Sequence, residues 1–245
     1  MRRILLLATT LSLLASSVSA SGFDLSALAC PGNSGISDDA GTLDCATGSV
    51  VELIVTFQPA EDIADFDRFD VLLYGQVAGG DLSSTASFWG PGSGWFQSGA
   101  FGVAAAPRDG MASCGGYTRA LDGVSGGVAG AVNVTGATTF RIDALGYRET
   151  PMSLTANQKV LAMVLRFDSA VHIPAESPLP GCSLPVCFSL QQLTPRHSDN
   201  TPGTILKTSA QFGTLVSING SGGQVECALV PVRRQTWGQL KQLYR

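Results

Sequence analysis

The chain has 245 residues, of which 44% are hydrophobic and 14% charged, and its formal net charge is −4. The acidic balance argues against nucleic acid as a partner. The 29 glycines and the scarcity of charged residues argue against a helical protein.

Residues 1–20 have the features of a secretory signal peptide. Arg2 and Arg3 precede an apolar run, and small residues ending in Val18-Ser19-Ala20 follow it. This pattern predicts export, with a mature chain that starts at Ser21 and is secreted, extracellular or held in the cell envelope. The apolar run is shorter than the roughly 20 residues that a bilayer requires, and we expect no transmembrane segment in the mature chain.

All six cysteines follow residue 20, and an even number of cysteines in an exported chain predicts disulfides. The candidates are Cys30, Cys45, Cys114, Cys182, Cys187 and Cys227. Cys30 with Cys45, and Cys182 with Cys187, would each close a short loop. Cys114 would then tie the middle of the chain to Cys227. Spacing favours this pairing only softly, and the other pairings stay open.

The first strong strand is predicted over residues 49–58. It is rich in β-branched and aromatic residues, with Val51, Leu53, Val55 and Phe57 on one face. Residues 23–28 alternate weakly before it, and residues 31–49 are expected to form a polar loop. Pro59 should end the strand.

An acidic connection follows and leads into a strand predicted over residues 69–77. Asp62, Asp65 and Asp67 lie in this connection, with Glu61 and Asp70 beside them. Several oxygen ligands on a flexible loop suit a hard cation, which makes these residues a candidate calcium site. Their spacing does not match an EF-hand loop. The alternative is a group of solvated acids at the mouth of a turn, with no cofactor bound.

Two aromatic pairs, Phe88-Trp89 and Trp95-Phe96, flank five strong turn formers. This arrangement predicts a hairpin or loop with aromatic residues at its base. The four aromatics have three interpretations: they cap the core, they form a platform that stacks on a sugar, or they form a protein contact patch.

The second half of the chain adds further strands. Residues 137–145 alternate, which favours a half-exposed strand, whereas residues 159–167 are apolar on both faces, which favours an interior strand over a short helix. The small residues of 123–134 form either a strand close to another backbone or a loop. Late strands are expected at residues 204–207, 212–218 and 224–227.

These elements predict an all-β fold over residues 21–230. The architecture expected is a single antiparallel β-sandwich, either a jelly roll or an immunoglobulin- or cohesin-like sandwich.

The sequence lacks the common catalytic motifs. His197-Ser198-Asp199 contains the residue types of a hydrolase triad, but a triad is assembled in space, and adjacent polar residues before Pro202 are typical of a turn. Gly123-Val124-Ser125-Gly126-Gly127 matches the letters of a Gly-x-Ser-x-Gly elbow, but it lies in a run of small residues with no predicted helix after it, and there is no His-Glu-x-x-His motif. We therefore assign no catalytic residue.

Residues 231–245 form a distinct basic tail with a charge of +4, and residues 21–230 carry −10. Thr236 is a suitable N-cap, and the apolar residues that follow it have helical spacing, which predicts a short amphipathic helix. The residues proposed for contact or sorting are Arg233, Arg234, Trp237, Leu240, Lys241 and Tyr244.

The segment Cys227–Arg245 resembles the ending of uncharacterised bacterial proteins that carry a signal peptide. Those proteins finish in a Thr/Ser-Trp-Gly-x-Leu/Ile/Val-Lys-x-Leu-Tyr/Phe-Arg pattern, which residues 236–245 match. The resemblance implies a secreted or envelope protein and brings no catalytic residue with it. A tail shared in this way suggests a sorting or anchoring signal, and the alternative is a helix docked on the sandwich.

These observations predict a secreted or cell-envelope structural or adhesive module without catalytic activity. Its expected partner is another protein or a second copy of the chain. A carbohydrate-binding module that holds a polysaccharide on the aromatics around Trp89 and Trp95 is the first alternative. An extracellular glycoside hydrolase with paired carboxylates is the second.

Overall fold

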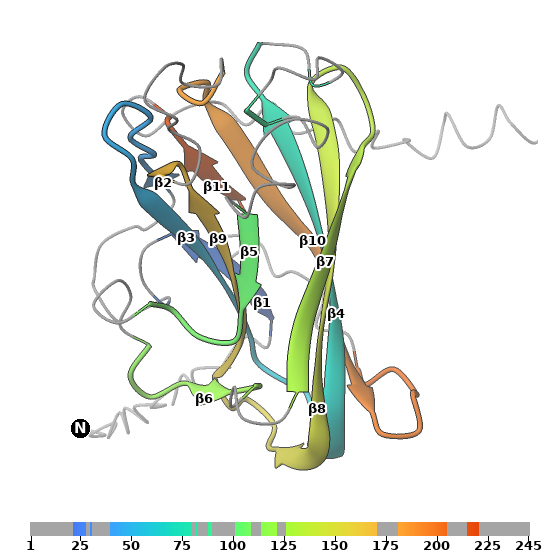
Figure 1. Ribbon diagram of the computed structural model, residues 1–245. Coiled ribbons are helices and arrows are strands. Elements are labelled where there is room, and N and C mark those ends of the chain that lie inside the picture. Colours follow the sequence, from blue (N-terminus) through green and yellow to red (C-terminus); the bar gives the residue numbers. More distant parts are fainter. Residues whose placement is uncertain are drawn as a thin grey trace, which may run out of the picture.

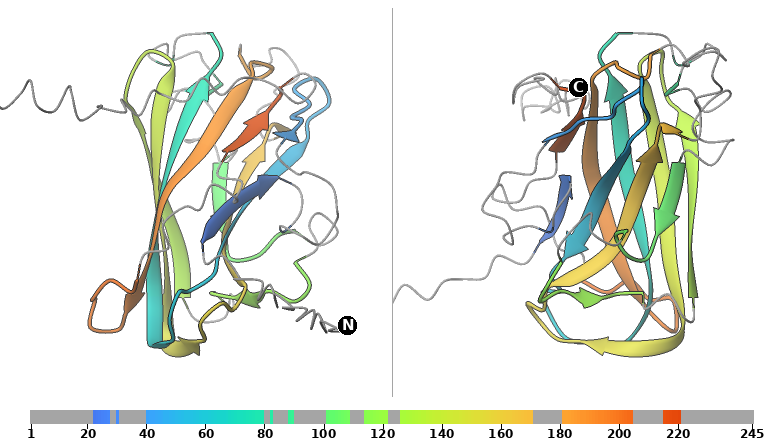
Figure 2. Two further views of the ribbon diagram at one scale, coloured as in Figure 1. Left: turned by 180° about the vertical axis from the view of Figure 1, so that it is seen from behind. Right: turned by 60° about the vertical axis from the view of Figure 1, so that its left-hand side comes forward.

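The computed structural model describes residues 22–27, 30, 40–79, 82, 88–89, 101–108, 114–121, 126–170, 181–204 and 215–220. These residues form two β-sheets packed face to face (Figures 1 and 2). The predicted all-β sandwich is confirmed. The predicted signal peptide, the basic tail with its helix, and the strand at residues 224–227 lie outside the described residues.

The first sheet, called the small sheet, has its centre at the most apolar run of the sequence. Its strands follow the order β1 (Phe23–Ala27), β3 (Val50–Phe57), β9 (Val160–Asp168), β5 (Phe101–Ala104), with β6 (Thr118–Arg119) also paired to β9. Every residue of β9 except Arg166 is buried, as the apolar character of both its faces predicted.

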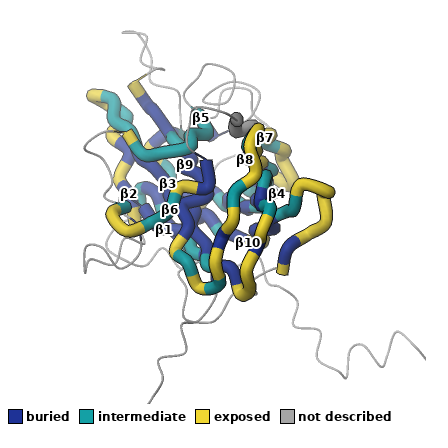
Figure 3. The backbone as a smooth tube through the Cα atoms, turned by 90° about the horizontal axis from the view of Figure 1, so that it is seen from below, coloured by how far each residue is buried: buried dark blue, intermediate teal, exposed yellow. Residues whose placement is uncertain are grey.

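The second sheet, called the large sheet, contains the longer strands. Its order is β2 (Ala40–Gly41), β11 (Leu215–Ile218), β10 (Val186–His197), β4 (Ile63–Val77), β8 (Thr139–Leu154), β7 (Gly126–Val134). Pairing is antiparallel throughout both sheets except for β2 with β11 and β6 with β9. On β4 and β8 buried and less buried residues alternate, whereas β3 and β9 are buried on both faces (Figure 3).

Three strand boundaries differ from the sequence prediction. β4 starts at Ile63, so most of the acidic stretch predicted as a connection is strand. β8 continues to Leu154, and β10 runs on to His197 through a stretch that was expected to be loop. All three extensions are rich in polar residues. A strand with one face toward solvent tolerates such residues. The polar pattern alone therefore did not distinguish these strands from loops.

Aromatic side chains fill the space between the sheets. Trp89 is fully buried, with its ring centroid 5.8 Å from that of Phe167 on β9 and 6.2 Å from that of Phe188 on β10. Phe88 is also buried and meets Trp89 edge to face at 5.0 Å. For Phe88 and Trp89 the core-capping interpretation is confirmed. Trp95 and Phe96 lie outside the described residues.

Two glycines of the large sheet make room for aromatic rings. Gly75 is paired with Phe140 across the β4–β8 ladder, and Gly146 is paired with Phe69. A Cβ atom at either glycine would overlap the ring of its partner. Glycine at these positions lets each ring lie flat against the neighbouring backbone and reach the core.

The disulfide pairing predicted from spacing is wrong. Cys30 is bonded to Cys114, with their Cα atoms 5.0 Å apart, and Cys45 is bonded to Cys182, with a Cα separation of 6.0 Å. Cys187 is also disulfide-bonded, and Cys227 lies outside the described residues. The spacing argument failed because the sandwich brings distant segments together at the ends of its strands.

Candidate functional site

The outward-facing residues of β7, β8, β4 and β10 form a continuous surface, called here the large-sheet face. The register sets apolar and charged residues of neighbouring strands side by side: Leu72 is paired with Asp143, and Asp70 with Leu145. Its main members are Arg68, Asp70, Leu72, Arg141, Asp143, Leu145, Tyr147, Gln192 and Arg196.

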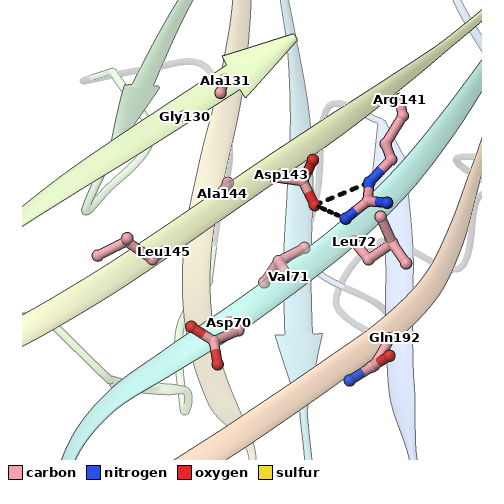
Figure 4. A pocket seen from close by; sticks show the side chains of 10 residues that line it. All are labelled: Asp70, Val71, Leu72, Gly130, Ala131, Arg141, Asp143, Ala144, Leu145 and Gln192. Carbon is pink, nitrogen blue, oxygen red and sulfur yellow. Dashed lines mark hydrogen bonds and ion pairs between the residues drawn. The ribbon is translucent and has the colours of Figure 1, made fainter. Parts of the chain in front are cut away.

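This face is hollowed into a groove. A depression of about 470 Å³ is lined by Asp70, Leu72, Arg141, Asp143, Leu145 and Gln192, together with β7 backbone at Gly130 (Figure 4). A second depression of about 330 Å³ shares Asp70 and Leu145 with the first and extends to Tyr147. Both volumes fall at the lower end of the range of ligand sites, and the two depressions together follow β8.

Arginine–aspartate pairs frame the groove and balance its charge. Arg141 donates to Asp143 through Nη2 at 2.5 Å and Nε at 2.9 Å, and this carboxylate raises the pKa of Arg141. Arg196 Nε donates to Asp70 at 2.5 Å, and Arg68 Nε donates to Asp67 at 3.2 Å. Each guanidinium is matched by one carboxylate, and the three pairs add no net charge to the face.

Two exposed apolar side chains lie on the large-sheet face. Among the described residues the large hydrophobic side chains that are exposed are Val134, Leu145 and Tyr147, with exposed fractions of 39%, 42% and 46%. Leu145 and Tyr147 lie on β8 and face outward, whereas Val134 on β7 is paired with the core residue Phe140 and lies on the other side of the sheet. The centre of the large-sheet face is thus apolar and its surroundings are ionic.

The outer face of the small sheet, called the small-sheet face, is covered. Ile54, Leu161 and Val164 form a second apolar cluster with Cys30, against which Tyr117 packs. Burial, and secondarily the Asp24 carboxylate, raises the pKa of Tyr117 to about 12. This face has no comparable exposed apolar centre among the described residues.

A buried ionic network completes the covering of the small-sheet face. The Glu52 side chain is fully buried and accepts hydrogen bonds from Arg166 Nε at 2.9 Å and Nη2 at 2.7 Å. The backbone N–H of Arg108 also donates to Glu52, at 3.1 Å, and Arg108 Nη2 reaches Asp168 at 3.3 Å. These contacts hold the segment after β5 against the sheet.

His197, Ser198 and Asp65 meet at the end of β10. His197 Nδ1 lies 2.5 Å from Asp65 Oδ1, and the Ser198 hydroxyl donates to Asp65 Oδ2 at 2.8 Å. These two hydrogen bonds hold the pKa of Asp65 below its ordinary value. The serine is bonded to the carboxylate and not to the imidazole, so this is not the arrangement of a nucleophile activated by a base. Ser198 and Asp199 form a turn, as predicted, whereas His197 is the last residue of β10.

The three aspartates predicted to bind calcium have separate partners. Asp62 accepts from the backbone N–H of Ala156 at 2.7 Å, Asp65 binds His197 and Ser198, and Asp67 pairs with Arg68. Across the part of the chain that the structure describes, no three His, Cys, Asp or Glu residues are grouped so that they could hold a metal ion. The calcium site stays a prediction.

The sequence predicted a sugar platform at residues 88–96, whereas the candidate site of the structure is on the large-sheet face. Phe88 and Trp89 are buried and cannot stack on a sugar in this structure. The groove on the large-sheet face was missed, although the alternation of residues 137–145 had placed Arg141 and Asp143 on the outward side. Register across strands was needed to bring Asp70 and Leu145 together, and a single sequence does not give it.

Comparisons with known proteins add little to these observations. No family model matches the sequence, and no curated protein is similar to it. A solved structure, the cohesin module from the family 33 glycoside hydrolase of Clostridium perfringens ATCC13124, aligns with 82% of this chain and 97% of the module, with a TM-score of 0.33 and 10% sequence identity. The assignment of the fold rests on the two sheets described above. Where the chain is described, no helix is both long and apolar enough to cross a membrane.

Proposed function

We propose that this chain is a non-catalytic binding module whose large-sheet face recognises a folded protein. The observation that carries the proposal is the placement of Leu145 and Tyr147, both more than 40% exposed, over a groove. Among the described residues, Val134 is the only other large hydrophobic side chain that is exposed. An apolar centre with a polar rim is the anatomy of a protein interface.

The charges of the face define the partner further. Arg68, Arg141 and Arg196 are each held by an aspartate, so these three pairs attract neither a polyanion nor a polycation by net charge. A complementary protein surface would present an apolar ridge to the groove and polar groups to the arginines around it. Arginine and tyrosine are the residue types enriched in such interfaces.

A protein fits the groove better than a polysaccharide does. Sugars are held by flat aromatic platforms, whereas the described lining of the two depressions contains the aliphatic side chains of Leu72 and Leu145 and a single aromatic one, Tyr147. Of the four aromatics predicted to form a platform, Phe88 and Trp89 are in the core, and Trp95 and Phe96 lie outside the described residues.

The cellular setting of the module belongs to the same proposal. Two disulfides, Cys30–Cys114 and Cys45–Cys182, are typical of proteins that fold in an oxidising compartment. Together with the signal-peptide pattern of residues 1–20, they support a secreted or envelope-bound protein. For the tail we propose a sorting role. Fusing residues 228–245 to a secreted reporter tests this, and an unchanged location of the reporter would reject it.

The binding function can be tested with variants of the face. The purified protein is used to capture a partner from the envelope and culture-medium fractions of the producing cells, and the affinity of the purified pair is then measured by calorimetry. Leu145→Arg and Tyr147→Ala should each weaken binding at least about tenfold, because truncation or charge at the centre of an interface costs more than about 1.4 kcal/mol.

The control variant is Ala46→Arg, in an exposed turn outside the large sheet. It should bind like the unmodified protein. If Leu145→Arg and Ala46→Arg bind the partner equally well, the face is not the binding site. If a purified polysaccharide is bound instead, with the same sensitivity to Leu145→Arg, the face is correct and the class of partner is wrong.

A further inference from the structure

β7 is an unusually long strand for the edge of a sheet. It has nine residues and pairs with β8 alone among the described strands. The other edge strands are shorter: β1 has five residues, β5 has four and β2 has two. Every second residue of an edge strand points its backbone N–H and C=O groups away from the sheet, where they can bind another strand.

The usual protection of such an edge is missing from β7. Residues 126–134 contain no charged residue and no proline, and the register with β8 runs from end to end without a bulge. Lysine, proline, bulges and short length are the devices by which proteins keep edge strands from pairing with one another. Gly130, Ala131, Asn133 and Val134 are exposed.

The order of residues along β7 is symmetric about its middle. Val128-Ala129-Gly130-Ala131-Val132 reads the same in both directions, and Gly130 is the central residue of the strand. In an antiparallel pair of two identical strands centred on Gly130, valine would face valine, alanine would face alanine and glycine would face glycine. Small residues at the centre also let two backbones approach closely.

We propose that β7 pairs antiparallel with β7 of a second copy of this chain, about a two-fold axis at Gly130. The two large sheets then form one continuous sheet. This is an isologous contact that closes on itself, so the product is a dimer and not a fibre. The inference does not depend on the function proposed for the large-sheet face.

The charges near β7 permit this contact. The charged residues of β8 in the register are Arg148, Asp143 and Arg141, which pair with Gly126, Ala131 and Asn133. In the dimer the two copies of β8 would be separated by both copies of β7, about 14 Å at three strand spacings. At that distance the ion pairs of the two copies are screened from one another at physiological salt.

The dimer should be weak and should bring two grooves together. A pair of edge strands with small side chains buries less than the roughly 1,200 Å² that stable complexes need, so association should depend on concentration. The groove of the large-sheet face reaches Gly130 and Ala131. Two copies joined at β7 would therefore present two grooves on one surface, which favours a partner with repeated binding sites.

Sedimentation velocity of the purified full-length protein, from about 1 µM to about 1 mM, tests the proposal. The unmodified protein should shift from monomer to dimer over this range. Ala131→Lys and Ala131→Asp should each stay monomeric, because the two substituted side chains lie diagonally across the two-fold axis, about 7–8 Å apart, and repel each other. An equimolar mixture of the two variants should form dimers again, since lysine then meets aspartate.

Gln191→Lys is the matched control, an exposed position on β10 in the interior of the same sheet. It should dimerise like the unmodified protein. Far-UV circular dichroism and melting curves establish that all variants are folded. A monomer at every concentration, or dimers of Ala131→Lys alone as tight as those of the unmodified protein, would overturn the proposal. So would a mixture of the two variants that fails to associate.

Discussion

The two outer faces of the sandwich differ in burial: the small-sheet face is covered, and the large-sheet face is exposed. β3 and β9 of the small sheet are buried on both sides, and their outward residues include Ile54 and Val164. β4 and β8 of the large sheet alternate, and their outward side carries Leu145 and Tyr147 in exposed positions. The small-sheet face therefore contributes to stability, and the large-sheet face is available for contact.

The charged side chains of the two faces also differ in burial. Glu52 has no exposed side-chain surface and binds Arg166, whereas Asp143 and Arg141 retain 39% and 43% of theirs. A buried carboxylate must keep its partner, because desolvation of an isolated charge is costly. An exposed pair is screened by water and contributes little to stability.

The largest effect is expected from the disulfide that fastens the covering of the small-sheet face. Replacing Cys30 and Cys114 together by alanine should lower the free energy of unfolding by about 4 kcal/mol, because the bond closes a long loop. The sequence separation of the two residues is 84. Urea denaturation of the oxidised proteins measures the change. A loss below about 1 kcal/mol would show that the covering segments hold without the bond.

Removing a carboxylate should lower the free energy of unfolding by a smaller amount. One such carboxylate can be removed on each face, so the two losses can be compared directly. Glu52→Ala should cost about 3 kcal/mol, since it removes the buried carboxylate that binds both the half-buried Arg166 guanidinium and the Arg108 backbone N–H. Asp143→Ala removes an arginine-bound carboxylate from the middle of a strand on the other face and should cost about 0.5 kcal/mol or less. Equal losses in denaturation experiments would contradict the contrast between the faces.

The smallest effect on stability is expected from replacing Asp65, and it appears only at acidic pH. The pKa of Asp65 is lowered in the folded protein, so its stabilising contribution is present above the unfolded pKa and is lost as the pH falls through the folded pKa. The unmodified protein should therefore lose more thermal stability than Asp65→Asn between about pH 5 and about pH 3. Identical losses would mean that the contacts with His197 and Ser198 do not stabilise the charged form.

Local patterns in the sequence were sufficient for the fold class and for the central strands. Residues 159–167 were identified as an interior strand because apolar residues on both faces are a local signal, and β3 was found in the same way. The second half of β10 was not found, since Gln191 and Gln192 resemble loop residues when their neighbours are unknown.

The site depended on contacts between residues far apart in the sequence. Asp70 and Leu145 are neighbours through the β4–β8 register, and Cys30 reaches Cys114 across the covering of the small-sheet face. Trp89 had three interpretations in the sequence, and its burial against Phe167 and Phe188 decided between them. These contacts follow from strand register and topology, and residue composition and cysteine spacing do not determine either of them.

Hydroxyl-radical footprinting of the protein alone and in its complex with the captured partner tests the central claim most directly. Leu145 and Tyr147 are exposed in the isolated chain and should be oxidised there. Both should become protected in the complex, while Tyr117 on the covered small-sheet face should react equally with and without the partner. Unchanged oxidation of Leu145 and Tyr147 in a saturated complex would contradict the claim.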